Sequence, residues 1–137
     1  MHTAEHILNG TMDRLFDCGR CFSAHIERKK SKCDYHFDRV LTPDEMEQVV
    51  SEVNAVIQSD LSVTEKFIPF ADAENQFNLD RLPEGNFSEI RIVHVGDYDA
   101  CPCIGPHVSK TSDIGTFRIT TSDFKDGVLR IRFKLKR

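Results

Sequence analysis

Residues 115–135 have the sequence G-T-F-R-I-T-T-S-D-F-K-D-G-V-L-R-I-R-F-K-L, in which two apolar-rich runs flank Asp126-Gly127. An Asp-Gly pair between such runs is a strong signal for a tight hairpin turn. From Leu129 to Leu135, apolar residues alternate with basic ones, as in a strand with one buried face. The stretch therefore predicts an antiparallel hairpin with strands at about 115–121 and 128–135.

The residues before this hairpin predict helices and further strands. Thr42 is a suitable N-cap, Pro43 fits the first helical position, and Glu45 completes a capping box for a helix that runs to about Ser59. A second hairpin is predicted at 21–27 and 33–40, with Cys33, Tyr35 and Phe37 on one face. The remaining expected elements are a helix at 2–16, strands at 63–70 and 90–95, a short helix at 71–77 and a long irregular loop at 97–113.

These elements predict an α+β fold over residues 1–137, a single domain with a mainly antiparallel β-sheet packed with helices. The length of 137 residues is typical of one domain. No apolar run is long enough to span a bilayer, and no charged-then-apolar leader opens the chain, so we expect a cytoplasmic protein without membrane association.

The net charge of −4 is unevenly distributed. Residues 43–89 hold eleven acids and two bases, a net of 2 − 11 = −9, so the other 90 residues sum to +5. An acidic average can therefore hide a basic face that binds nucleic acid. The basic residues form two clusters, Arg28, Lys29, Lys30 and Lys32, then Arg130, Arg132, Lys134, Lys136 and Arg137.

Two short motifs supply candidate metal ligands. His2 and His6 stand four residues apart in H-T-A-E-H, which places both imidazoles on one helix face. Cys103 and His107 stand four apart in C-I-G-P-H and complete a His/His/Cys/His set of the kind that Zn²⁺ favours. Cys101, two residues before Cys103, is an alternative ligand. An odd count of five cysteines favours thiolates for metal binding or chemistry over a disulfide framework.

A competing zinc site has the spacing C-x2-C-x11-C-x2-H, formed by Cys18, Cys21, Cys33 and His36. The predicted hairpin counts against it, because residues three apart in a strand point to opposite faces. Burial as a small apolar-like thiol is the simpler expectation for Cys33. His25 and His94 have no partner in the sequence and are expected to be structural.

The two motifs resemble those of aminoacyl-tRNA editing domains: H-T-A-E-H near a helix start, and C-I-G-P-H followed by Val108 and T-S-D-I-G at 111–115. The size, the H-F-D-R segment at 36–39 and the closing hairpin resemble the free-standing alanyl-tRNA editing proteins over nearly the whole chain. The G-P-H at 105–107 is more similar to the threonyl-tRNA synthetase editing domain. The resemblance is therefore to the alanyl/threonyl-tRNA synthetase editing-domain superfamily.

This resemblance implies a trans-acting hydrolase that removes a wrong amino acid, typically serine, from the acceptor end of a mischarged tRNA(Ala). By motif position, the catalytic and zinc-binding residues are His2, His6, Cys103 and His107, with a zinc-bound water as nucleophile. Four protein ligands close a tetrahedral shell, so hydrolysis requires an expanded shell or a displaced ligand. The threonyl-like G-P-H also allows metal-independent orientation of water, as in editing of Ser-tRNA(Thr).

Substrate contacts are less well defined in the sequence. Alanyl-type editors carry Gly-Gly-Thr where this chain has Ile104-Gly105-Pro106. Ser23 lies roughly where such editors have a hydroxyl residue that senses the serine side chain, and Asp97 and Asp99 are candidates for binding the α-amino group. The alternatives are a zinc-stabilised tRNA-binding module without turnover and a hydrolase of the same fold that acts on a small ester or amide.

Overall fold

The computed structural model describes residues 1–77, 88–103 and 105–136, and these residues form an α+β fold, as predicted. In chain order the elements are α1 His2–Phe16, β1 Ser23–Ile26, β2 Ser31–His36, α2 Pro43–Gln58, β3 Val63–Pro69, α3 Phe70–Gln76, β4 Glu89–Val95, β5 Asp99–Pro102, the 3-10 helix η1 Thr111–Ile114, β6 Thr116–Lys125 and β7 Val128–Lys136. Within these residues, no helix combines the length and apolarity needed to cross a membrane.

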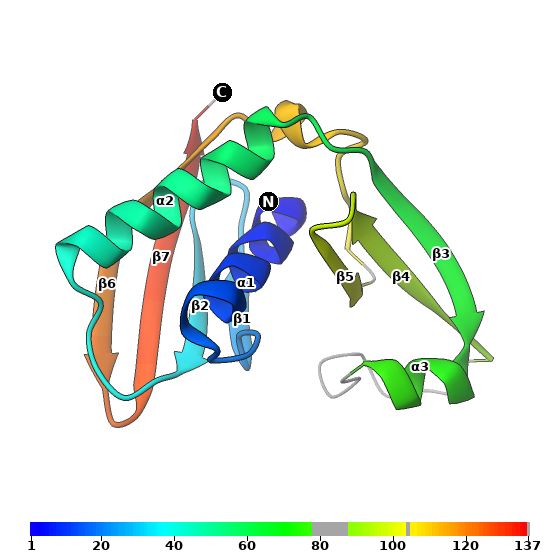
Figure 1. Ribbon diagram of the computed structural model, residues 1–137, viewed down its shortest axis with the longest axis horizontal. Coiled ribbons are helices and arrows are strands. Elements are labelled where there is room, and N and C mark those ends of the chain that lie inside the picture. Colours follow the sequence, from blue (N-terminus) through cyan, green and yellow to red (C-terminus); the bar gives the residue numbers. More distant parts are fainter. Residues whose placement is uncertain (78–87, 104, 137) are drawn as a thin grey trace.

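The strands form two antiparallel sheets, where the sequence predicted one. The larger has the order β1-β2-β7-β6 and the smaller the order β3-β4-β5. Asp126 and Gly127 both have positive φ, 50° and 78°, which confirms the predicted turn between β6 and β7. In Figure 1, α1 lies between the two sheets and α2 crosses the larger one.

The expectation of an irregular loop at 97–113 was wrong for residues 99–102 and 111–114. Residues 99–102 form β5, which pairs with β4 at the edge of the smaller sheet, and η1 follows at 111–114. All four residues of β5 are half-buried, so the strand shows no alternation of apolar and polar positions. β5 pairs with β4 through main-chain hydrogen bonds, which cannot be predicted from the order of apolar and polar side chains.

The second hairpin begins and ends at other residues than predicted, but its predicted faces are largely correct. Cys33 and Tyr35 are fully buried, while Asp34 on the other face pairs with Arg130 of β7 at 2.8 Å. β2 ends at His36. The N–H of the next residue, Phe37, donates to the carbonyl of Gly127 in the turn between β6 and β7. The H-F-D-R segment then leads directly to the start of α2.

The capping box of α2 is confirmed. The Glu45 N–H donates to Thr42 Oγ1 at 3.1 Å, and the Thr42 N–H donates to Glu45 Oε1 at 2.9 Å. Arg39 adds two hydrogen bonds to the same carboxylate, at 2.6 and 2.7 Å. The Arg39 hydrogen bonds and the capping contact lower the pKa of Glu45 to about 2. The carboxylate is therefore ionised at neutral pH and joins the H-F-D-R segment to the helix start.

Helix α1 is buried along most of its length: every residue from Thr3 to Met12 is buried. Its apolar side chains pack in one core with residues of β2 and β7: Ala4, Ile7, Leu8, Met12, Cys33, Tyr35, Leu129, Ile131 and Phe133. The polar Asn9 is buried with them and accepts hydrogen bonds from the Tyr35 hydroxyl at 2.7 Å and the Cys21 N–H at 3.3 Å. The helix that carries H-T-A-E-H is thus fixed from several sides.

We expect Thr42→Ala to lower the free energy of unfolding by about 1 kcal/mol, because it removes the N-cap acceptor of α2. Chemical denaturation followed by circular dichroism measures the change. Thr42→Ser keeps the hydroxyl and is the matched control, expected to stay close to the unmodified chain. Equal stability of the alanine and serine variants would show that the capping box contributes nothing.

Candidate active site

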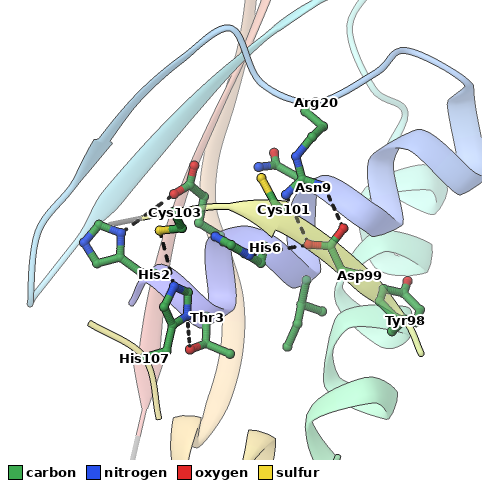
Figure 2. A network of polar contacts seen from close by, with 12 residues as sticks. His2, Thr3, His6, Asn9, Arg20, Tyr98, Asp99, Cys101, Cys103 and His107 are labelled. Atoms are coloured by element: carbon green, nitrogen blue, oxygen red, sulfur yellow. Dashed lines mark hydrogen bonds and ion pairs between the residues drawn. The ribbon is translucent and has the colours of Figure 1, made fainter. Parts of the chain in front are cut away.

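The two predicted motifs meet between α1 and the segment that follows β5 (Figure 2). Three residues, His6, Cys103 and His107, each offer one ligand atom, and these three atoms lie within 4.8 Å of one another. The imidazole rings of His6 and His107 meet edge to face with centroids 4.7 Å apart. Three of the four residues expected to form the metal site are therefore adjacent, although Thr3 of the first motif and His107 of the second stand 104 positions apart in the sequence.

His2 lies beside this cluster without joining it. Its ring centroid is 6.1 Å from that of His107, its side chain is one-third exposed, and its Nδ1 is 4.0 Å from Oε1 of Glu5. Gly105 packs against the ring, and a Cβ at that position would come within 2.8 Å of His2 Nδ1. The glycine in C-I-G-P-H therefore lets the loop approach the first turn of α1; Ile104, its neighbour in the motif, lies outside the described residues.

The sulfur of Cys103 has two hydrogen-bond partners. His107 Nε2 lies 3.3 Å from Cys103 Sγ, and the N–H of Gly105 donates to the same sulfur at 3.3 Å. Burial raises the pKa of Cys103, but hydrogen bonding from His6 and from Gly105 outweighs burial and leaves the pKa below its ordinary value. The site thus favours the thiolate, which is the form that binds a metal.

His107 is held by the first motif. Its Nδ1 lies 2.8 Å from Oγ1 of Thr3, and the same hydroxyl accepts a hydrogen bond from the Val108 N–H at 3.3 Å. Burial, then the positive charges of His6 and Arg91, lower the pKa of His107 to about 3. Its imidazole is therefore neutral at physiological pH, as a metal ligand must be.

His6 is backed by Asp99 and Arg20. Asp99 Oδ2 lies 3.5 Å from His6 Nδ1, a buried nitrogen that has no hydrogen bond of ordinary geometry with the described part of the chain. Arg20 binds both carboxylate oxygens of Asp99, at 2.6 and 3.2 Å. Burial lowers the pKa of His6, but the hydrogen bonds and charges of Asp99 and Cys103 leave it above its ordinary value. Figure 2 shows this chain of contacts from Arg20 through Asp99 to His6.

The three residues expected to contact substrate, Ser23, Asp97 and Asp99, differ in burial and in their neighbours. The Asp99 side chain is only 7% exposed and faces His6 and Arg20, whereas Asp97 is exposed in the turn before β5. Ser23 is exposed in β1, opposite Asp34 of β2. The geometry gives Asp99 a contact with a candidate metal ligand, and the substrate roles of all three residues stay predictions.

The other cysteines lie apart from the three-residue cluster. Cys101 is half-buried with Sγ 3.4 Å from the Pro102 carbonyl, and burial raises its pKa to about 11. Of the competing set, Cys21 and Cys33 are buried close together near Glu5. Cys18 contacts the Met12 carbonyl instead, and His36 is an exposed residue whose ring stacks on Phe22. The C-x2-C-x11-C-x2-H spacing therefore does not gather its four residues at one point.

Sequence reasoning missed three supporting side chains: Thr3, Arg20 and Arg91. Arg91 of β4 donates from Nη1 to the carbonyls of Gly105 at 2.8 Å and Cys103 at 3.3 Å, which holds the loop against the sheet. A charged residue inside the strand I-R-I-V-H-V was the available signal for Arg91, and the position of Thr3 inside H-T-A-E-H was the signal for Thr3. Arg20 follows Gly19 in an irregular segment and carried no signal.

The donor set of the cluster fits Zn²⁺. Two imidazoles and one thiol are the nitrogen and sulfur ligands that this ion prefers. Their protonation also fits, because His107 is neutral and the Cys103 thiolate is favoured. Asp99 beside His6 supplies the carboxylate that commonly orients a metal-binding histidine from behind.

Comparison with known proteins gives the same family as the motifs. Residues 90–132 match the family described as "Threonyl and Alanyl tRNA synthetase second additional domain". The chain is 31% identical to the alanine-tRNA ligase of Halorubrum lacusprofundi and 33% identical to that of Aeropyrum pernix, in each case over 96% of this chain and 15% of the relative. It thus spans about 15% of the length of these curated relatives. The chain belongs to the alanyl/threonyl-tRNA synthetase editing-domain superfamily.

Proposed function

We propose that the chain hydrolyses the ester that joins a wrong amino acid to the terminal ribose of tRNA(Ala). The main substrate in this proposal is Ser-tRNA(Ala). Homology to the editing-related domain of alanyl-tRNA synthetases supports an editing role in general. The observation that carries the hydrolytic proposal is the convergence of His6, Cys103 and His107 within 4.8 Å. Attachment of amino acids, the activity named in the relatives, is not proposed for a chain that spans about 15% of them.

In this proposal His6, Cys103 and His107 hold a Zn²⁺ ion. When bound, the ion supplies a Lewis acid that lowers the pKa of water and polarises the ester carbonyl. A shell of these three donors would leave a fourth position for water, and the predicted role of His2 as a fourth ligand stays a prediction. His2 lies at the rim, one-third exposed, where a side chain meets an incoming substrate.

The other residues keep this cluster in place. Thr3 fixes the ring of His107, Arg91 holds the backbone of Cys103 and Gly105, and Asp99 orients His6 while Arg20 neutralises the carboxylate. Preset positions of this kind reduce the reorganisation needed in the transition state. At neutral pH the His107 imidazole is already uncharged, and the lowered pKa of Cys103 makes its thiolate easier to form than that of an ordinary cysteine.

The tRNA partner is proposed from the distribution of basic residues. Arg130 and Arg132 of β7 are paired with Asp34 and Asp123, so their charges are partly neutralised. Arg28, Lys29 and Lys30 are exposed between β1 and β2. These exposed cations are the candidates for phosphate contacts, which release counterions and make binding weaker at high salt.

Deacylation assays test the proposal directly. We expect the purified chain to hydrolyse Ser-tRNA(Ala) faster than Gly-tRNA(Ala), Ala-tRNA(Ala) or Ser-tRNA(Thr), to lose this activity with a chelator, and to regain it with Zn²⁺. A metal-independent mechanism is indicated instead if the chelator has no effect. If no charged tRNA is hydrolysed faster than in buffer alone, the enzyme proposal is wrong, and salt-dependent binding without turnover would then favour the tRNA-binding module.

Cys103→Ala and Cys101→Ala form a matched pair. We expect Cys103→Ala to reduce kcat by more than about 100-fold, because loss of a ligand should exceed the 10- to 100-fold effect typical of an outer-shell partner. Cys101→Ala should keep most of the activity, because its sulfur lies outside the cluster. Single-turnover deacylation gives the rates, and circular dichroism checks the fold. The opposite ranking would mean that Cys101 is the functional thiol.

Asp99→Asn tests the orientation of His6, with Asp97→Asn as the exposed control. We expect Asp99→Asn to weaken zinc affinity and lower kcat by about 10- to 100-fold with little change in KM, as for other outer-shell carboxylates. Asp97→Asn should leave zinc affinity and kcat unchanged, and a rise in its KM would assign α-amino binding to Asp97. If Asp99→Asn instead raises KM and leaves zinc affinity and kcat unchanged, Asp99 binds the substrate α-amino group, as the sequence suggested.

A further inference from the structure

A second group of candidate metal ligands lies behind the first turns of α1. Glu5, Cys21 and Cys33 place one carboxylate oxygen and two sulfurs within 4.8 Å of one another. All three residues are buried, with exposed fractions of 5%, 3% and 0%. They come from α1, from the segment before β1 and from β2, so only the folded chain assembles them.

The backbone around this group is well anchored. Cys33 stands in β2 between two partner strands, opposite Ala24 of β1 and Ile131 of β7. The Cys21 N–H donates to Oδ1 of Asn9, and Cys21 Sγ lies 3.5 Å from Oε2 of Glu5. The donors are therefore brought together by the hydrogen bonds and packing that also hold α1 to the larger sheet.

The chemistry of the group favours a thiophilic divalent cation. Two thiolates and a carboxylate would carry three negative charges in a buried place, which is very costly without a compensating cation. Zn²⁺ binds sulfur and carboxylate ligands in such sites and displaces the thiol protons. Ca²⁺ and Mg²⁺ prefer sites made only of oxygen ligands, so two sulfurs disfavour them.

We propose that Glu5, Cys21 and Cys33 bind a second Zn²⁺ ion, separate from the cluster of His6, Cys103 and His107. The two sites share no residue. This site keeps two cysteines of the C-x2-C-x11-C-x2-H spacing and takes Glu5 in place of His36, which is exposed and stacked on Phe22. Cys18 lies outside the group and is not a ligand.

The second ion would have a structural role with an effect on the active site. Glu5 lies between the two histidines of H-T-A-E-H, and its Oε1 is 4.0 Å from His2 Nδ1. An ion held through Glu5 would tie the first turn of α1 to β2 and so fix the place of His2. The inference does not depend on catalysis, because metal content is measured without substrate.

Zinc content of the full chain, measured by mass spectrometry after saturation with Zn²⁺ and removal of excess ion, tests the proposal. We expect Cys21→Ser and Glu5→Gln each to contain one zinc ion fewer per chain than the unmodified protein. Cys18→Ser, a half-buried thiol outside the group, is the matched control and should lose none. Equal zinc content in all four proteins, or loss in Cys18→Ser alone, overturns the proposal.

Cobalt spectroscopy separates loss of the site from loss of the fold and from the active-site cluster. In Cys103→Ala loaded with Co²⁺, a thiolate-to-cobalt charge-transfer band should remain, because Cys21 and Cys33 still supply sulfur. The band should disappear in Cys103→Ala/Cys21→Ser and remain in Cys103→Ala/Cys18→Ser, with circular dichroism unchanged. A Cys103→Ala protein that binds Co²⁺ without any thiolate band, or binds none, contradicts the second site whether or not the chain deacylates tRNA.

Discussion

The burial of α1 between the two sheets is the constraint on which the rest of this structure depends. A helix that is enclosed from Thr3 to Met12 must satisfy its polar side chains inside the protein. Asn9 does so through Tyr35 and Cys21, whereas His6 is left with the Asp99 carboxylate 3.5 Å from its buried Nδ1. The same enclosure that stabilises the fold thus creates the polar groups from which chemistry can be built.

The enclosure also explains why distant parts of the chain meet. Gly10 has no side chain where Tyr98 and Asp99 approach α1, and a Cβ there would lie 3.2 Å from the Tyr98 ring. Tyr98 binds the Thr11 hydroxyl at 2.7 Å and lies under the Arg14 guanidinium. The turn before β5 is therefore docked on the middle of α1, and β5 then carries the chain toward Cys103. Packing along the helix sets the position of the second motif.

Local signals in the sequence predicted the local features well. The cap at Thr42, the Asp126-Gly127 turn and the spacing of His2 and His6 depend on residues only a few positions apart, and the α+β class follows from such elements. The pairing of Asp99–Pro102 with β4 and the division into two sheets depend on main-chain contacts between segments far apart. No side-chain periodicity encodes those contacts, so an irregular loop was predicted in their place.

The same distinction applies to the site. His2, His6, Cys103 and His107 were predicted as a group because each motif has an internal spacing that suits a metal, and the last three lie together in the structure. The contacts of Asp99 with His6 and Arg20, and of Arg91 with the Cys103 loop, arise only where strands and helix approach one another. Asp99 was predicted only as a candidate for binding the substrate α-amino group, and its contact with His6 was not foreseen. Supporting residues of this kind carry little signal in a single sequence.

The hydroxyl of Thr3 has a consequence for the tautomer of His107. Its oxygen already accepts the Val108 N–H, so toward Nδ1 of His107 it can either donate its own hydrogen or accept the ring N–H. The orientation of the Thr3 hydroxyl hydrogen is therefore matched to the tautomer of His107: a donating hydroxyl favours the proton on Nε2, and an accepting one favours it on Nδ1. In one state Nε2 presents N–H to the Cys103 sulfur, and in the other it presents a lone pair to whatever occupies the site.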